Sequence, residues 1–366
     1  MSARHTSGGH RVGAVPRWAP TRRLHHVRGE DAAFTELVQR HRRELRVHCY
    51  RMLGSYDEAE DLVQETFLRA WKGMAAFEGR SSVRVWLYRI ATNACLDALD
   101  GRARRVLPPD LRPPSDASAD LPPRTDLPWL QPFPDRLWEP AAPEDADPAA
   151  VAVTRETIEL AFLAALQHLP PRQRAALLLF DVLGWRAAQI APVLGGSVAS
   201  VNSALQRARA TLRERLPERR AEWSSATGAT AEERAVLRRY MDAVERADLD
   251  TVAALLAEDV RTSMPPWPMW LRGRDAVVAA LATSWDPAAP HYVGRFTVLP
   301  VRANAQPAAA AYVRGRDDTV AHAFAVSVLR IEHGLVVEAT AFHDTGLFPA
   351  FGLPMTLPGK MSAAGR

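Results

Sequence analysis

The spacing of apolar residues along the chain predicts two helical blocks. From Asp31 to about residue 105 apolar side chains recur at helical intervals, as in Phe34, Leu37 and Val38, and a further helix is expected over 82–103. Helical periodicity resumes near residue 151 and continues to about 216, with breaks at a double proline and a double glycine. Each block is long enough to form a small helical domain of its own.

A different pattern follows the Ser/Gly/Thr-rich break at 224–230. Two helices are expected over about 231–257, and strand-like alternation then appears at 293–301, 309–314, 320–332 and 335–342. Helices followed by a run of strands indicate an α+β domain. The fold class expected is therefore multidomain, with two all-α domains and a C-terminal α+β domain.

Two stretches lack helical periodicity. Residues 1–29 carry six arginines and no acid and are expected to form a disordered basic arm, while 106–150 contains 12 prolines, which predicts an extended linker. Five apolar residues make that linker too apolar for a plain tether and predict a docked segment: Trp129, Leu130, Phe133, Leu137 and Trp138. The expected domain boundaries are 1–29 for the arm, 30–105 for the first helical block, 106–150 for the linker, 151–223 for the second block, 231–345 for the α+β domain and 346–366 for a C-terminal tail.

Composition narrows the class of protein. With 47% apolar and 24% charged residues, no apolar run of membrane-spanning length and no signal core near the N-terminus, a cytoplasmic protein without membrane contact is expected. Cys49 and Cys95 lack metal or disulfide spacing, so they are interpreted as buried thiols, and neither a metal nor a cofactor is expected. Charge is uneven: the linker has nine acids and three bases, whereas 151–223 has ten bases and six acids. Such asymmetry suggests nucleic-acid contact by some segments.

The second block contains a helix-turn-helix pattern. Ala191, Gly195 and Val201 supply the small residue at the helix crossing, the left-handed turn and the buried anchor that this motif requires. A helical hairpin with a solvated basic face is the alternative. Pro192 lies inside the first helix of the motif, so that helix is expected to be kinked or short.

Longer segments of the sequence resemble a known protein family. The strings "LGSYDEAEDLVQETFLRAW" and "FEGRSSVRVWLYRIATNACLDALDGRARR" resemble region 2 of extracytoplasmic-function sigma-70 factors, and "LPPRQRAALLLFDVLGWRAAQIAPVLGGSVASVNSALQRARATLRERL" resembles their region 4. The resemblance covers about 185 residues in the family's order. It implies a sigma factor that binds core RNA polymerase through its β and β′ subunits and directs promoter recognition and transcription initiation.

The resemblance also assigns residues to three surfaces. Binding to the polymerase β′ clamp is implied for an acidic stripe with an apolar edge: Asp57, Asp61, Gln64, Glu65 and Leu68. Capture of an unstacked base of the minus-10 element is implied for Phe77, Arg80, Ser81, Trp86, Arg89 and Asn93, since stacking planes and cations suit single-stranded DNA. Contact with the minus-35 element is implied for Ser200, Asn202, Ser203, Gln206 and Arg207. A solvated helix face and a core role for Trp86 are the alternatives.

The C-terminal segment resembles the SnoaL-like branch of the nuclear transport factor 2-like fold, a cone of helices against a curved sheet. The strings that carry this are "RRYMDAVERADLDTVAALLAEDV", "MPPWPMWLRGRDAVVAAL" and "GLVVEATAFHD". The fold encloses a pocket, and the candidate lining for a small-molecule ligand is Trp267, Trp270, Phe342 and His343. Enzymes of this fold use Asp or His as acid and base, which would suit Asp344 and His343. For these residues structural packing is expected first, and ligand sensing or intramolecular regulation second. Regulation of the sigma domains in cis, in place of a separate anti-sigma protein, is expected of this domain instead of catalysis.

Two other functions remain open at this point. A ligand-responsive helix-turn-helix regulator would need neither the acidic stripe nor the minus-10 residues, and an enzyme with a DNA-binding fusion would need turnover in the C-terminal domain. The expected partners are core RNA polymerase, promoter DNA and a small molecule.

Overall fold

The computed structural model describes residues 21–77, 81–116, 119, 121–138, 158–216 and 230–358. Residues 1–41 and 42–366 are two compact units. Helix α1 (Thr21–Leu53) begins within the stretch expected to be a disordered arm. This corrects the prediction of disorder for residues 21–29. Once a helix is nucleated, each further residue adds one hydrogen bond, so good helix formers such as Arg and Leu can extend it without an apolar face. The rest of the arm, 1–20, lies outside the described residues.

In the first helical block α2 (Tyr56–Gly73) packs against α3 (Val83–Leu99), with a short 3₁₀ turn, η1 (Met74–Ala76), after α2. The end of α1 contacts both helices, because Arg46 donates to Glu60 on α2 and His48 hydrogen-bonds to Thr92 on α3. Gly54 ends α1 in the left-handed conformation at φ +69°. The side chain of Ser55 then caps α2 by accepting from the Glu58 backbone N–H. Cys49 and Cys95 are buried free thiols, as expected.

The linker is docked over the part that the structure describes. It contains two 3₁₀ turns, η2 (Pro108–Asp110) and η3 (Asp135–Leu137), and Val106 forms an isolated β-bridge with Trp129. Leu130, Phe133 and Trp138 are 1%, 0% and 5% exposed, so this part of the linker packs against the rest of the chain and is no plain tether. The expected linker residues 139–150 lie outside the described residues.

The second helical block contains α5 (Leu160–Gln167), α6 (Pro171–Leu177), a π turn η4 (Leu178–Val182), α7 (Ala187–Ile190) and α8 (Val198–Arg215). The first helix of the motif is short and ends before Pro192, as that residue predicts. Gly195 has φ +62°, and Ala191 and Val201 are buried. The helix-turn-helix pattern therefore has the local structure that its residues require.

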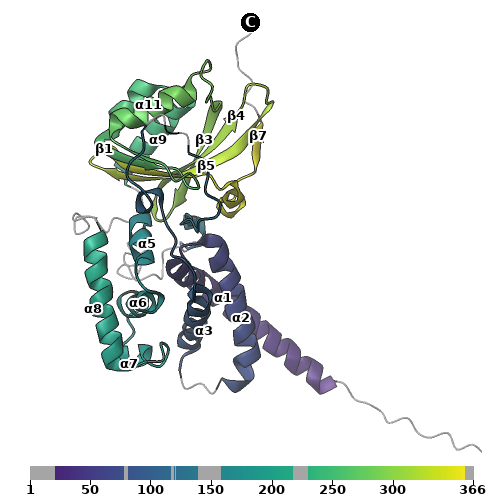
Figure 1. Cartoon of the computed structure of the whole chain (residues 1–366). Coiled ribbons are helices and arrows are strands. Elements are labelled where there is room, and N and C mark those ends of the chain that lie inside the picture. The colour runs from purple at the N-terminus through teal and green to yellow at the C-terminus, as the bar shows by residue number, and fades with distance from the viewer. Residues whose placement is uncertain are drawn as a thin grey trace, which may run out of the picture. The chain divides into compact units, whose positions relative to one another are not determined.

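The C-terminal domain packs three helices against one sheet. The helices are α9 (Ala231–Arg246), α10 (Leu249–Leu255) and α11 (Arg274–Trp285), and the strands are β1 (Leu256–Ser263), β2 (Trp270–Arg272), β3 (Arg295–Ala303), β4 (Gln306–Arg314), β5 (Val320–Glu332), β6 (Leu335–Phe342) and β7 (Thr356–Pro358). The strand order is β2-β1-β6-β5-β4-β3, β7 pairs with β5, and β1 runs parallel to β6. Figure 1 shows α9 and α11 on one face of the curved sheet, where Val236, Val252 and Leu329 join the core.

The stretch expected as a C-terminal tail belongs to this domain as far as residue 358. A 3₁₀ segment, η6 (Thr345–Phe351), buries Leu347 and Phe348, and β7 then adds to the sheet. Burial of these apolar side chains outweighs the entropy of ordering the segment. Residues 359–366 lie outside the described residues.

Candidate functional site

The acidic stripe lies along one side of α2 and is largely open to solvent. Its members are three or four residues apart, which places them on neighbouring turns of one helix face. Glu65 is half-buried and pairs with Arg69 at 2.8 Å, whereas the others are exposed: Asp57, Asp61, Gln64 and Leu68.

The apolar edge of the stripe is larger than the sequence pattern indicated. Leu68 is 55% exposed and Trp71, three residues further on, is 40% exposed. Exposed large apolar side chains beside charged residues are typical of protein-binding surfaces.

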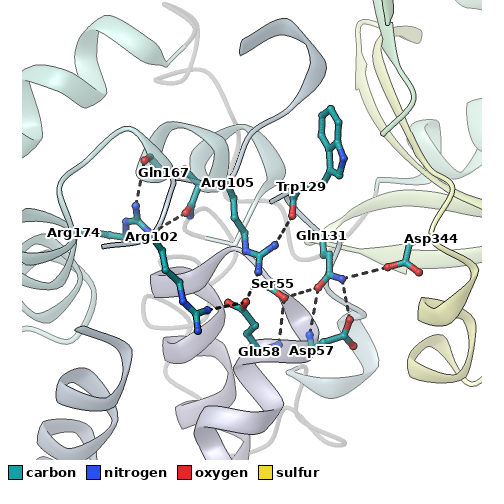
Figure 2. A network of polar contacts seen from close by, with 10 residues as sticks. All are labelled: Ser55, Asp57, Glu58, Arg102, Arg105, Trp129, Gln131, Gln167, Arg174 and Asp344. Carbon is teal, nitrogen blue, oxygen red and sulfur yellow. Dashed lines mark hydrogen bonds and ion pairs between the residues drawn. The ribbon is translucent and has the colours of Figure 1, made fainter. Parts of the chain in front are cut away.

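The linker engages the first residue of the stripe (Figure 2). Gln131 donates through Nε2 to Asp57 at 2.9 Å and to Asp344 of the C-terminal domain at 3.3 Å. Its Oε1 accepts from the Ser55 hydroxyl at 2.7 Å. One linker amide therefore joins the start of α2 to the C-terminal domain.

The residues assigned to the minus-10 element lie along α3 and just before it. Phe77 packs against Trp86 with ring centroids 4.7 Å apart, so Trp86 is partly a packing residue. Asn93 lies seven residues after Trp86, on the same side of the helix. Ser81 and Arg89 are exposed. Arg80 lies outside the described residues.

The residues assigned to the minus-35 element lie on α8, and all are exposed: Ser200, Asn202, Ser203, Gln206 and Arg207. Ser200 differs from the rest, because its hydroxyl donates to the Ser197 carbonyl at 2.7 Å and accepts from the Ser197 N–H at 3.0 Å. It thus completes the capping box that starts α8. Its hydroxyl is therefore engaged in capping the N-terminus of α8.

A buried arginine joins the two helical blocks. Arg174 on α6 is 2% exposed and donates to the backbone carbonyl of Met52 on α1. It also donates to Gln167 Oε1 at 2.8 Å, to the Gln167 carbonyl at 3.2 Å and to the Leu169 carbonyl at 3.1 Å. Burial lowers the pKa of its guanidinium to about 10.

The tip of the β3–β4 hairpin is buried against the rest of the chain. Ala303 pairs with Gln306, so Asn304 and Ala305 form a two-residue turn with φ +58° and +59°. Such tips are normally exposed, yet Asn304 is 0% exposed. Burial of a hairpin tip implies that other segments satisfy its polar groups.

Those groups are satisfied by three separate segments. The Asn304 amide nitrogen donates to Tyr50 Oη on α1 and to the Ile158 carbonyl before α5, both at 2.9 Å. Its amide oxygen accepts from the Phe133 N–H of the linker at 2.9 Å. The neighbouring Ala305 N–H donates to Asp135 at 2.8 Å. One turn therefore contacts both helical blocks and the linker.

The linker makes a second set of backbone contacts with the C-terminal domain. The Trp270 indole donates to the Arg112 carbonyl at 2.8 Å, and the Trp270 carbonyl accepts from the Ser115 N–H at 2.8 Å. The Arg124 N–H donates to the Pro266 carbonyl at 2.9 Å.

The candidate ligand residues fall into two groups. Trp267 and His343 meet with ring centroids 5.0 Å apart, and Phe324 lies 4.7 Å from His343 on centroids. Burial lowers the His343 pKa to about 4, and Nδ1 of His343 has no partner among the described residues. Trp270 and Phe342 are buried, and the polar group of Trp270 is occupied by the linker.

The acid/base pair suggested by sequence has other contacts. Asp344 caps η6 by accepting from the Gly346 N–H at 3.1 Å, besides contacting Gln131. Its carboxylate is therefore used structurally. Within the described residues there is no cluster of His, Cys, Asp or Glu suited to a metal ion, and no helix there is long and apolar enough to cross a membrane.

Sequence reasoning missed Gln131, Asn304, Gln167 and Arg174. Each is a polar residue whose contacts come from segments far away in the chain, so local periodicity carries no signal for them. A signal did exist for Asn304, because Asn followed by a small residue between two strand patterns is typical of a tight hairpin turn.

Comparison with known proteins gives three family matches. Residues 37–105 match Sigma-70 region 2, residues 159–212 match Sigma-70 region 4, and residues 237–339 match the SnoaL-like domain.

Curated relatives of the chain are ECF RNA polymerase sigma factors. The ECF RNA polymerase sigma factor SigG of Mycobacterium tuberculosis is 45% identical over 331 residues, which is 90% of this chain and 85% of the relative. SigM of the same species is 32% identical over 188 residues, 51% of this chain and 79% of the relative. The crystal structure of the Mycobacterium tuberculosis sigma factor SigJ has a TM-score of 0.54 at 24% identity and covers 88% of this chain and 99% of that one, which shows likeness of fold.

Proposed function

The chain belongs to the extracytoplasmic-function (ECF) RNA polymerase sigma factors, and on this basis we propose that its C-terminal domain holds the sigma module, residues 42–216, in a closed arrangement that core polymerase must open. A sigma factor directs core RNA polymerase to promoters, so core polymerase is the partner and the cytoplasm is the place of action. The promoter-specificity function thus belongs to the sigma module, and regulation belongs to the domain fused after it.

The polymerase surface in this proposal is the acidic stripe of α2 with its apolar edge. Asp61, Gln64 and Leu68 are exposed and available to a basic, partly apolar partner. Complementary charge raises the rate of encounter, and the apolar edge supplies area to bury. Trp71 extends that edge and belongs to the proposed surface.

The promoter surfaces are α3 for the minus-10 element and α8 for the minus-35 element. The Phe77–Trp86 pair offers a stacking platform for an unstacked base, and Asn93 offers donor and acceptor groups nearby. On α8, Asn202, Gln206 and Arg207 are exposed and suited to base edges and phosphates.

The buried Asn304 turn carries the proposal of a closed arrangement. It hydrogen-bonds to α1, to the linker and to the segment before α5 at once. The resemblance to sigma factors implies that the segment between regions 2 and 4 threads the active-site cleft and RNA exit path of the polymerase. A linker held in this way is not free to follow that path. Binding of core polymerase must therefore break these contacts, and their free energy opposes that binding.

The size of this opposition follows from the three hydrogen bonds of the Asn304 side chain. Each contributes on the order of 1 kcal/mol in a folded protein, and removal of the amide leaves its buried partners unsatisfied in the closed form alone. Because 1.4 kcal/mol is a factor of ten, we expect loss of the amide to shift the balance toward the open form by about tenfold or more.

The test is Asn304→Gly in the full-length chain, measured as transcription with core polymerase on a promoter that it recognises. Glycine accepts the positive φ of this turn, so the change removes the side chain with little backbone strain. We expect a higher yield of transcript at limiting concentrations of the factor. The matched control is His333→Gly at the exposed β5–β6 turn, where φ is +51°.

Equal transcription by the wild type and Asn304→Gly would overturn the closed-form proposal. An equal rise in Asn304→Gly and His333→Gly would assign the effect to general loosening of the domain.

A small-molecule ligand of the C-terminal domain is a second proposal, favoured by the buried, unpartnered Nδ1 of His343 beside Trp267 and Phe324. A neutral imidazole among aromatic rings suits a flat ligand with one hydrogen-bonding group. Catalysis is not proposed, because Asp344 is held by η6 and Gln131. Loss of transcriptional response to such a ligand in His343→Phe would support sensing, and turnover of the ligand would contradict it.

A further inference from the structure

The first turn of α8 carries a large apolar side chain that is open to solvent. Val198 is 45% exposed, although it lies three residues before Val201, which is 2% exposed. Leu205 and Ala208 continue the buried face that Val201 begins. Helical spacing alone therefore places Val198 beside the buried residues, and its exposure shows that no described part of the chain covers this turn.

The polar side chains of the same turn are already engaged. Ser197 Oγ accepts from the Ser200 N–H at 3.2 Å. Ser200 Oγ accepts from the Ser197 N–H at 3.0 Å and donates to the Ser197 carbonyl at 2.7 Å. Both hydroxyls thus serve the capping box, and the other two side chains of the turn, Val198 and Ala199, are exposed and apolar.

The space beside this turn is open. Two glycines precede it, and a Cβ placed on Gly195 would meet nothing within 4 Å. Val198 also lies four residues before Asn202, so the two side chains occupy neighbouring turns of α8. Asn202, Gln206 and Arg207 are exposed on the turns that follow. Val198 therefore extends the surface proposed to contact the minus-35 element, and no side chain of the glycine pair keeps a duplex away from it.

An apolar side chain at this place has one partner in DNA. The second helix of a helix-turn-helix enters the major groove with the residues of its first turns at the base edges. Hydrogen-bond donors and acceptors cover those edges, and the 5-methyl of thymine is the one apolar group among them. Contact between this methyl and an exposed valine removes apolar surface of both from water.

We propose that Val198 is a specificity-determining residue that packs on the 5-methyl group of a thymine in the minus-35 element. The inference rests on the assignment of α8 to that element and adds a contact that hydrogen-bonding residues do not supply. It favours thymine over cytosine, because cytosine has no methyl group and presents an N4 amino donor where thymine has the O4 acceptor.

The test uses holoenzyme, assembled from core polymerase and the full-length chain, to select duplexes from a randomised pool. Each thymine of the selected minus-35 element is then replaced, one at a time, by deoxyuridine, which lacks only the methyl group and keeps the base pairing. We expect one position at which this replacement weakens binding of the wild type by about threefold to fivefold. Val198→Ala should bind the thymine and deoxyuridine duplexes equally, with an affinity close to that of the wild type for deoxyuridine.

The matched control is Met355→Ala, which shortens an apolar side chain of similar exposure, 46%, in the C-terminal domain. It should keep the full difference between thymine and deoxyuridine. If no thymine of the element is sensitive to loss of its methyl group, the proposal is overturned. Equal sensitivity in the wild type and Val198→Ala overturns it as well, because the methyl group would then contact another residue.

Failure of this contact is distinguishable from failure of the α8 assignment. If Arg207→Gln weakens binding to the selected duplex while deoxyuridine has no effect at any position, α8 still binds the minus-35 element and only the Val198 contact is overturned. If holoenzyme selects no minus-35 sequence, or Arg207→Gln binds the selected duplex as the wild type does and deoxyuridine has no effect, the assignment of α8 and the Val198 contact fail together.

Discussion

Gly54 illustrates how a single residue fixes the contact between region 2, the linker and region 4. At φ +69°, a Cβ placed there would lie 2.8 Å from Leu130 Cδ1 of the linker and 3.0 Å from Gln167 Nε2. The chain can turn from α1 into α2 at this point only because no side chain intervenes. The tight approach also brings Gln167 over the end of α1.

Gly54→Ala is therefore expected to destabilise the protein through two effects, positive φ and steric overlap. The first costs about 1–2 kcal/mol and the second adds to it. The control is Gly101→Ala, where φ is +67° but a Cβ would meet nothing within 4 Å. Thermal unfolding should show a clearly larger fall in Tm for Gly54→Ala. Equal losses in both variants would show that the overlap is relieved without cost.

Two buried histidines give the protein a predictable dependence on pH. Burial lowers the pKa of His48 to about 3 and that of His343 to about 4, below the ordinary value of 6.5. As pH falls through 6.5, both histidines bind protons in the unfolded chain but stay neutral in the folded chain. Their contribution to stability is therefore complete above pH 6.5 and is lost progressively as pH falls, toward 4 for His343 and toward 3 for His48.

His343→Phe should remove part of this dependence. We expect its Tm to fall less than that of the wild type between pH 7 and pH 5, since one proton uptake by the unfolded chain is gone. His322→Phe, at an exposed position on β5, is the comparison. Parallel curves for all three proteins would contradict the burial argument for His343.

At the scale of elements, α2 separates its buried packing residues from its exposed polar residues by face. Val63, Phe67 and Ala70 are buried on one side, while Asp61 and Leu68 lie open on another. Glu65 is half-buried beside Arg69, and an exposed pair of this kind contributes little to stability. The polar side of α2 can therefore change without loss of the fold.

Asp61→Lys with Glu65→Lys should accordingly weaken binding to core polymerase by about tenfold or more while the Tm changes little. Surface capture of labelled full-length protein by immobilised core polymerase measures this. Asp242→Lys with Asp259→Lys, two exposed acids of the C-terminal domain, is the charge-matched control. Undiminished capture of the α2 double variant would show that the acidic stripe is not part of the interface with core polymerase.

Elements with strong periodicity were predictable from sequence and the others were not. The expected strand at 320–332 coincides with β5 and that at 335–342 with β6, because alternation is clear in both. β2 and β7, of three residues each, are too short to show a period. The helical start of α1 at Thr21 was missed because it depends on propensity instead of an apolar face.

The candidate site divides in the same way. That the assigned residues of α2, and those of α8, share one helix face followed from their spacing, and apolar content alone indicated that the linker is no plain tether. What it docks against was not predictable. Asn304 lies 171 residues from Phe133 and 254 from Tyr50, and such pairings arise from the tertiary fold.

At the scale of the whole molecule, the C-terminal domain meets the linker at several places, among them the Ala350 carbonyl of η6, which accepts from Arg136 at 2.8 Å. Trp270 and Pro266 bind its first half, Asp344 binds Gln131, and the Asn304 turn binds Phe133. The contacts are individually modest but are made by a domain on the same chain, at high effective concentration. In the closed form proposed above, core polymerase competes with this internal partner for the linker.

Restraining the linker on the C-terminal domain tests this account most directly. Gln131→Cys with Asp344→Cys, whose native side chains lie 3.3 Å apart at Nε2 and Oδ2, can be joined by a short bis-maleimide, while Cys49 and Cys95 are buried. The affinity for core polymerase is then measured before and after crosslinking, with each single variant treated alike. The account predicts binding at least about tenfold weaker in the crosslinked double variant than in the single variants. Equal affinity in all of them would contradict the claim that polymerase must open this chain.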